Sequence, residues 1–284
     1  MTSTTTPGTG SQAGGDRTRI SLLQAVNDTL VITQRNLLRN VRLPQLLLFA
    51  TVQPVMFLLL FTFVFGGAIE GAVPGDFEYL QFLMPGLLIQ IAAFGAGQTA
   101  LGLTEDLQKG VVDRFRALPM ARSAVLAGRT LADLLRNAGV LALMLLVGFA
   151  IGFRYESGLL RFLAAFGLGL LFSYALSWVM ATIGLKVRTP EAASSAVFLP
   201  IFPLVFASSV FLPTHTMPDW LRVFADNQPI SIVANALRGL MLGEEVLLPG
   251  ESVGGYVGAS LLWIGGITAV FSLLAVRAYR RAVV

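Results

Sequence analysis

The sequence predicts an all-α membrane protein with six transmembrane helices. Hydrophobic residues make up 55% of the 284 residues and charged residues 13%, against roughly 25% charged residues in soluble domains. Six apolar runs are long enough to cross a bilayer as helices, which takes roughly 20 residues each. The Lys and Arg residues cluster on one side of these runs. Together these observations place the chain in the membrane class.

The chain divides into three parts. Residues 1–19 are mostly Thr, Gly and Ser and are expected to be a disordered tail. Residues 20–42 are expected to form an amphipathic helix in the membrane interface, with apolar residues at helical spacing, namely Leu23, Val26, Leu30, Leu37 and Val41. Its other face carries Arg35, Arg39 and Arg42, which would point towards lipid headgroups. The alternative is an ordinary solvated helix. Residues 43–281 form the transmembrane domain.

The expected transmembrane segments are six apolar runs, at about 44–67, 80–103, 131–153, 162–185, 192–212 and 256–276. Asp133 and Arg136 fall in the first turns of the third run, so its membrane part is expected to begin near Asn137. No ionisable residue is then expected near the middle of any span, which argues against ion-coupled transport. Prolines interrupt the first, second and fifth spans, where gating and packing both remain open as explanations.

The orientation follows from the positive charges. Sixteen of the twenty Lys and Arg residues fall on the side of the two termini, and only Arg154, Arg161, Arg222 and Arg238 fall on the other. Cytoplasmic segments carry the excess of Lys and Arg. Both termini are therefore expected to be cytoplasmic.

The segment between the fifth and sixth runs contains two short amphipathic pieces, Asp219–Ala225 and Ser231–Leu242. They are expected to form a re-entrant helical hairpin on the outer side, with Trp220 and Phe224 at the headgroups and Arg238 on a polar face. A plain surface loop is the alternative. His215, the single histidine, lies in a polar turn and is assigned no chemistry.

The longest mixed-charge block, Glu105–Arg129, lies on the cytoplasmic side. It carries an apolar stripe on a short helix that ends at Pro119, formed by Val111, Val112, Phe115 and Leu118. So short a helix is not stable alone, and we expect it to dock in a cleft of another protein. A solvated loop is the alternative.

No enzymatic site is expected in this chain. A phosphate-binding loop needs Lys followed by Ser or Thr, but Lys109 precedes Gly110 and Lys186 precedes Val187. There is no cysteine, no hydrolase or metalloprotease motif, and no metal site is expected. One polar face of the second span, formed by Gln90, Phe94 and Gln98 at i, i+4 and i+8, is a candidate for the transport path. Packing between helices explains these residues equally well.

The run EDLQKGVVDRFRALPMARSAVLAGR and the segment from Arg188 to Gly243 resemble ABC-2 type permeases, and most closely the daunorubicin/doxorubicin-resistance type of drug exporters. The likeness extends from Leu43 to Arg277. Where many relatives have Asn directly before Pro in the outer segment, this chain has Asn227-Gln228-Pro229.

The resemblance implies a dimer of permeases that works with two copies of a separate ATPase subunit, which would hold the ATP and Mg. It implies a coupling helix seated in the ATPase, with candidate residues Glu105, Asp106, Lys109, Val112, Asp113, Arg114, Phe115 and Arg116. It further implies a bacterial cytoplasmic membrane location, contact with lipid, an amphipathic substrate, and no nucleic acid partner.

The function that these features predict is a non-catalytic permease subunit of an ATP-binding-cassette exporter for amphipathic drugs or lipid-like compounds. One alternative is a permease for a cell-envelope lipid or glycan intermediate. Alternatives of other classes are an ion-coupled secondary transporter and a membrane scaffold or sensor that does not transport.

Overall fold

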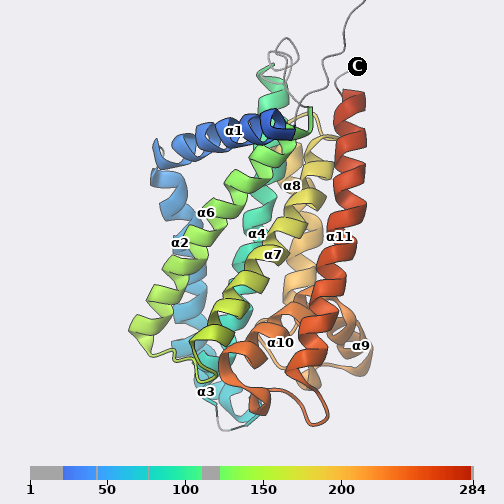
Figure 1. The fold of residues 1–284 in the computed structure, drawn as a ribbon. Helices are drawn as coiled ribbons and strands as arrows, with labels where there is room; N and C mark the ends of the chain where they lie inside the picture. Colours follow the sequence, from blue (N-terminus) through green and yellow to red (C-terminus); the bar gives the residue numbers. More distant parts are fainter. Residues whose placement is uncertain (1–21, 43, 76, 111–121, 283–284) are drawn as a thin grey trace, which may run out of the picture.

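The computed structural model describes residues 22–42, 44–75, 77–110 and 122–282. Within these ranges the chain forms a helical bundle without β-strands (Figure 1). The prediction of an all-α membrane fold is confirmed.

Six helical passes run along the bundle. They are α2 (Pro44–Leu59), α4 (Tyr79–Gln108), α6 (Arg122–Ile151), α7 (Leu159–Gly184), α8 (Pro190–Phe206) and α11 (Val253–Ala282). The first pass continues from α2 through a π-helical segment, Leu60–Phe65, into α3 (Gly66–Ile69). Five of these passes are long and apolar enough to cross a membrane. The sixth, α8, has 17 residues, which corresponds to about 25 Å.

The short α8 differs from the predicted fifth span, 192–212, because the helix stops at Phe206 and the chain beyond it is not helical. Pro200 and Pro203 weaken the end of the helix, since proline donates no backbone hydrogen bond. Gln228 satisfies the carbonyls left over at this end, donating from Nε2 to Leu204 O at 2.9 Å and to Ala207 O at 2.6 Å. The polar side chain thereby replaces the missing helical turn.

Helix α4 is the centre of the bundle. It packs against α6, α7, α8 and α10 (Pro229–Leu242), and it is buried on nearly all sides over its first 26 residues. A helix that is apolar all round is expected in such a position. A hydrogen bond links α4 to α7: the hydroxyl of Thr104 donates to the carbonyl of Gly184 at 3.0 Å. Helix α4 therefore contacts most of the other helices of the bundle.

Helix α1 (Leu22–Arg42) lies across the end of the bundle at which α11 finishes (Figure 1). Its buried side faces α6 and includes Ile32, Thr33 and Asn36. Thr33 Oγ1 donates to Gly128 O on α6 at 3.2 Å. The apolar residues Val26 and Leu30, which the sequence pattern singled out, are more than half exposed. Helix α1 thus has a protein-facing side and a separate exposed apolar side, as a helix in a membrane interface requires.

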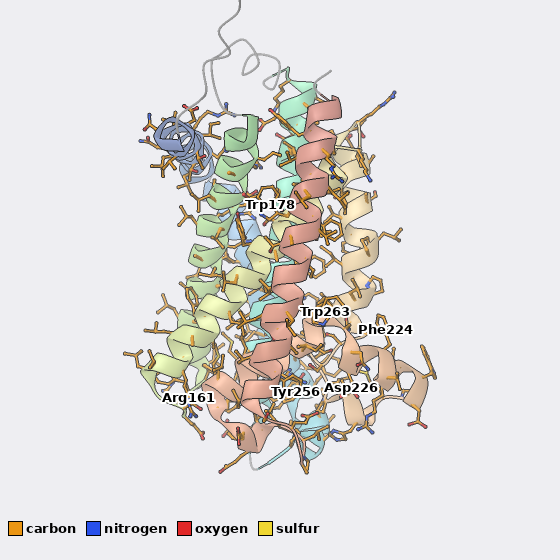
Figure 2. All side chains as sticks on the ribbon, turned by 45° about the vertical axis from the view of Figure 1, so that its right-hand side comes forward. Arg161, Trp178, Phe224, Asp226, Tyr256 and Trp263 are labelled. Carbon is orange, nitrogen blue, oxygen red and sulfur yellow. The ribbon has the colours of Figure 1, made fainter. Side chains whose placement is uncertain are left out.

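At the opposite end lie α9 (Asp219–Asn227) and α10, separated by the extended residue Gln228. Figure 2 shows Phe224 and Asp226 on α9 at this end, together with Tyr256 at the start of α11. Helix α9 exposes Trp220 by 76% and Phe224 by 47%. Helix α10, in contrast, is buried along almost its whole length, so it belongs to the core of the bundle.

Candidate functional site

A cavity of about 540 Å³ lies between the helices near the end that carries α1. Residues from α1, α2, α4, α6 and α8 line it. Its wall combines apolar side chains with a set of polar and charged ones: Asn36, Gln53, Gln90, Gln98, Glu105, Arg129, Asp133, Arg136, Asn137 and Ser194. Such a mixed wall suits a compound with both apolar and polar groups.

The three residues predicted for the transport path all lie on this wall. Gln90, Phe94 and Gln98 come from one face of α4, as their spacing requires. Gln90 is only 3% exposed. The ring of Phe94 lies 6.1 Å from the ring of Phe198 on α8, measured between centroids, so the two phenylalanines form an aromatic part of the cavity wall. That this cavity carries substrate stays a prediction.

The charges of α6 lie deeper in the bundle than the sequence suggested. Helix α6 begins at Arg122, so Arg136 stands halfway along its 30 residues. Its Nη2 donates to the carbonyl of Gly95 on α4 at 2.7 Å, and Gly95 lies about 20 Å from the α1 end of that helix. The expectation that no ionisable residue lies far inside a span is therefore wrong.

Partners on neighbouring helices stabilise these buried polar groups. Asp133 is 2% exposed and accepts a hydrogen bond from Thr99 Oγ1 at 2.7 Å. Asn137 Nδ2 donates to Ser173 Oγ on α7 at 2.6 Å. A Cβ at Gly95 would lie 2.5 Å from Asn137 Oδ1, so a glycine at this position lets α6 approach α4. Burial of such groups costs several kcal/mol unless they are paired.

A chain of four charges connects α1, α4 and α6. Arg35 lies 3.8 Å from Asp106, Arg129 lies 3.6 Å from Asp106, and Arg129 lies 3.3 Å from Asp133. A Cβ at Gly102 would clash with the guanidinium of Arg129, so this arginine passes directly over the α4 backbone. The four charges alternate in sign, and they link the end of α4 to the cavity wall.

The predicted coupling residues are only partly described. Glu105 and Asp106 lie in the last turn of α4, and Lys109 caps that helix, so this part of the predicted coupling helix is a continuation of a transmembrane helix. Lys109 Nζ lies 3.2 Å from Glu105 Oε2. The remaining coupling candidates lie outside the described residues: Val112, Asp113, Arg114, Phe115 and Arg116. The side chains of Arg39 and Arg42 in α1 also lie outside the described part.

Arg238 does not lie on a polar surface, and that expectation is wrong. The residue is fully buried, with 0% exposure. Its guanidinium donates to the carbonyls of Phe82, Ser209 and Val210 and to the side chains of Ser209 and Asn235. It also lies 3.6 Å from the centre of the Phe82 ring. Arg238 therefore ties α10 to α4 and to the segment after α8.

Three buried polar atoms on the cavity wall have no hydrogen-bond partner among the described residues. They are Asn36 Oδ1, Gln90 Oε1 and Arg136 Nε. Unpaired buried polar atoms are rare in native proteins, and three of the seven found among the described residues belong to this cavity wall. In the described ranges no three His, Asp or Glu side chains group to hold a metal ion.

The sequence reasoning missed the contribution of α6 to this cavity. Arg129, Asp133, Arg136 and Asn137 follow i, i+4, i+7 and i+8, the spacing that places side chains on one face of a helix. This spacing indicates a shared polar face. It did not lead to a prediction, because charges near the start of an apolar run are also typical of a membrane boundary.

Comparison with known proteins agrees with the architecture. Residues 27–242 match the family model for the ABC-2 type transporter. The chain is 36% identical over 256 residues to a daunorubicin resistance ABC transporter permease protein of Streptomyces coeruleorubidus, covering 90% of this chain and 87% of the relative. It is 28% identical over 208 residues to a doxorubicin resistance ABC transporter permease protein of Mycobacterium tuberculosis, covering 73% and 71%.

Proposed function

Since the chain belongs to the ABC-2 type transporter family, we propose that it is the permease subunit of an exporter that moves amphipathic drugs or lipid-like compounds out across the bacterial cytoplasmic membrane. The similarity to a daunorubicin resistance permease over 90% of the chain carries this proposal. The multi-pass helical bundle supports it.

The cavity is the proposed transport path. Phe94 and Phe198 supply an aromatic wall, while Gln90, Gln98 and Arg136 supply hydrogen-bonding groups. An amphipathic compound can satisfy both kinds of wall at once, whereas a purely apolar compound would leave the polar groups unpaired. The cavity lies towards the α1 end, from which a cytoplasmic or inner-leaflet substrate would arrive.

A permease of this family requires an ABC ATPase partner. We propose two ATPase copies on a permease dimer, with ATP and Mg bound by the ATPase. The docking segment would be 105–116, which begins in the charged last turn of α4. The ion-pair chain through Asp106 and Arg129 offers a physical route from that segment to the cavity. Family permeases are normally non-catalytic, and no nucleotide motif occurs in this sequence.

Both termini are proposed to be cytoplasmic. Helix α1 and the end of α11 lie at the same end of the bundle (Figure 1), and this is the end to which most Lys and Arg residues belong. The exposed aromatic residues of α9 at the other end fit an outer membrane–water interface.

One observation favours an ion-coupled secondary transporter as the second candidate. Asp133 is a carboxylate buried inside the bundle, where proton-coupled transporters place their titrating groups. Its Oδ2, however, is already occupied by an ion pair with Arg129 and a hydrogen bond from Thr99. The energy source of transport therefore separates the two candidates.

The test is reconstitution of the chain with its ATPase subunit in inside-out proteoliposomes. Daunorubicin uptake should require ATP, and it should stop when the ATPase carries a substitution of its catalytic glutamate. Uptake that continues without ATP under a proton gradient would establish the secondary transporter instead. ATP hydrolysis that does not respond to any amphipathic compound would instead indicate a membrane scaffold or sensor that does not transport.

A further inference from the structure

Among the four charged residues of the cavity wall, Arg136 alone forms no ion pair in the described part of the chain. Glu105 pairs with Lys109 at 3.2 Å, and Arg129 pairs with Asp133 at 3.3 Å. Arg136 lies within 4 Å of no carboxylate among the described residues. A partly buried cation without an ion pair loses hydration that a ligand with an oxygen acceptor can replace.

The guanidinium of Arg136 bonds its neighbours through Nη2 alone. Its Nη2 donates to Gly95 O at 2.7 Å and to Asn137 Oδ1 at 3.1 Å. Its Nε is buried and has no partner in the described part of the chain. A residue that served only to tie α6 to α4 would need the Nη2 contacts alone. The unused Nε lies on an oxygen-binding edge of the guanidinium group, which matches carboxylate and phosphate geometry.

The surroundings of Arg136 define the rest of the ligand. Phe94 and Phe198 offer aromatic surface on the same cavity wall. Gln90, which is 3% exposed, has an amide oxygen without a partner among described residues. An amide at this position bonds a hydroxyl or amino group of a ligand. The ligand must therefore have an aromatic body, an oxygen acceptor and a neighbouring polar hydrogen.

We propose that Arg136 is the specificity-determining residue of this cavity, and that it binds amphipathic aromatic compounds through an oxygen acceptor, with the highest affinity for an anionic one. The proposal rests on the proposed export function, whose substrate class it narrows. Two sources can supply this chemistry, namely a water-soluble amphipathic anion and an anionic lipid headgroup. Gln90 adds a second polar contact to either.

The test compares two probes that share one apolar skeleton. Pyrenebutyrate carries an anion, and pyrenebutanol carries a neutral hydroxyl in its place. Their equilibrium binding to the permease–ATPase complex in nanodiscs, and their ATP-dependent uptake into inside-out proteoliposomes, give a Kd and a KM for each. Partition into the lipid is the same for all protein variants, so it cancels when variants are compared.

Arg136→Gln should raise the Kd and KM for pyrenebutyrate by on the order of tenfold to hundredfold, the value of a charge-assisted hydrogen bond. The values for pyrenebutanol should change by less than about threefold, because a neutral hydroxyl makes a weaker hydrogen bond. Arg136→Lys, which keeps the charge, should keep the preference for the anion. Arg161→Gln is the matched control, since Arg161 is exposed at the opposite end of the bundle (Figure 2), and it should bind both probes as the unchanged chain does.

If Arg136 has only a structural role, Arg136→Gln should weaken the binding of both probes equally, and this result would overturn the proposal. Equal affinity of the unchanged chain for both probes would overturn it too. If Arg136→Gln does not assemble, Gln90→Glu adds a carboxylate to the same wall and should lower the affinity for the anion selectively. Competition by phosphatidylglycerol would identify a lipid headgroup as the natural ligand, and its absence a soluble anion. If binding is selective but no probe is moved by ATP, the proposed export function fails while the site stands.

Discussion

Arg238→Met should destabilise the outer end of the bundle strongly although the residue lies far from the cavity and the coupling segment. Methionine has a similar length and fills most of the space, but it donates no hydrogen bond. The guanidinium bonds three backbone carbonyls and two side chains, which belong to Phe82, Ser209, Val210 and Asn235. The substitution therefore removes the donor from all of these groups together.

The loss of unfolding free energy depends on how many hydrogen-bond acceptors have no donor other than Arg238. Phe82 O lies inside α4 and keeps its helical hydrogen bond, and Asn235 Oδ1 keeps the hydrogen bond that Ser209 Oγ donates to it at 3.1 Å. The carbonyls of Ser209 and Val210 lie outside a helix and lose their donor. Each buried acceptor left unpaired costs about 1–3 kcal/mol, and relief of the buried charge offsets part of the sum. A net loss of about 3 kcal/mol lowers the Tm by about 6–12 °C for a chain of this size.

The assay is thermal unfolding of the purified protein in nanodiscs, with size-exclusion chromatography to verify assembly. Arg222→Met is the matched control, because Arg222 lies on neighbouring α9 in an exposed ion pair with Asp226 at 3.5 Å. Exposed pairs contribute about 0–1 kcal/mol, so this variant should shift the Tm by less than about 3 °C. Equal shifts for both variants would refute the role assigned to Arg238.

Three further predictions concern the route from the ATPase to the cavity. Asp106→Asn removes the carboxylate shared by Arg35 and Arg129, so the number of substrate molecules moved per ATP should fall by on the order of fivefold; an unchanged ratio would contradict the coupling role. Gly102→Ala places a methyl group where the Arg129 guanidinium lies, and because a side-chain end can move aside, the protein should assemble but show the same loss of transport per ATP. Normal transport would mean that the ion-pair chain has no role. Phe115→Asp should release the ATPase subunit during co-purification without lowering the Tm of the permease, and a complex that stays intact and active would exclude this segment as the docking site.

Much of the architecture could be predicted because apolar run length and helix-breaking residues act locally. The long helices follow from hydrophobic runs, and the break between α9 and α10 follows from Asn227, Gln228 and Pro229. The early end of α8 could not be predicted from the local sequence. It depends on Gln228, which satisfies the last carbonyls of α8 from more than 20 residues away. No local pattern reveals a cap of that kind.

Arg238 shows the limit of amphipathic patterns. On the sequence it is the single charged residue of a short apolar helix, and a polar face was the natural interpretation. The three backbone carbonyls that accept its hydrogen bonds lie 28, 29 and 156 residues away in the chain. A charged residue is buried when the fold brings enough acceptors together, and only the tertiary structure contains that information. The prediction failed because local amphipathicity cannot distinguish a solvated charge from a fully bonded one.

The charges of α6 alter the argument about mechanism. A span without inner ionisable groups would speak against ion coupling, but Asp133 and Arg136 lie inside the bundle. They differ in their pairing, since Asp133 has both Arg129 and Thr99 as partners, whereas Arg136, which lines the cavity, has no partner for its Nε among the described residues. An arginine does not titrate at neutral pH, so it can bind a substrate but cannot carry a proton across the membrane. The same buried charges that weaken the sequence-based argument thus favour substrate recognition over proton coupling.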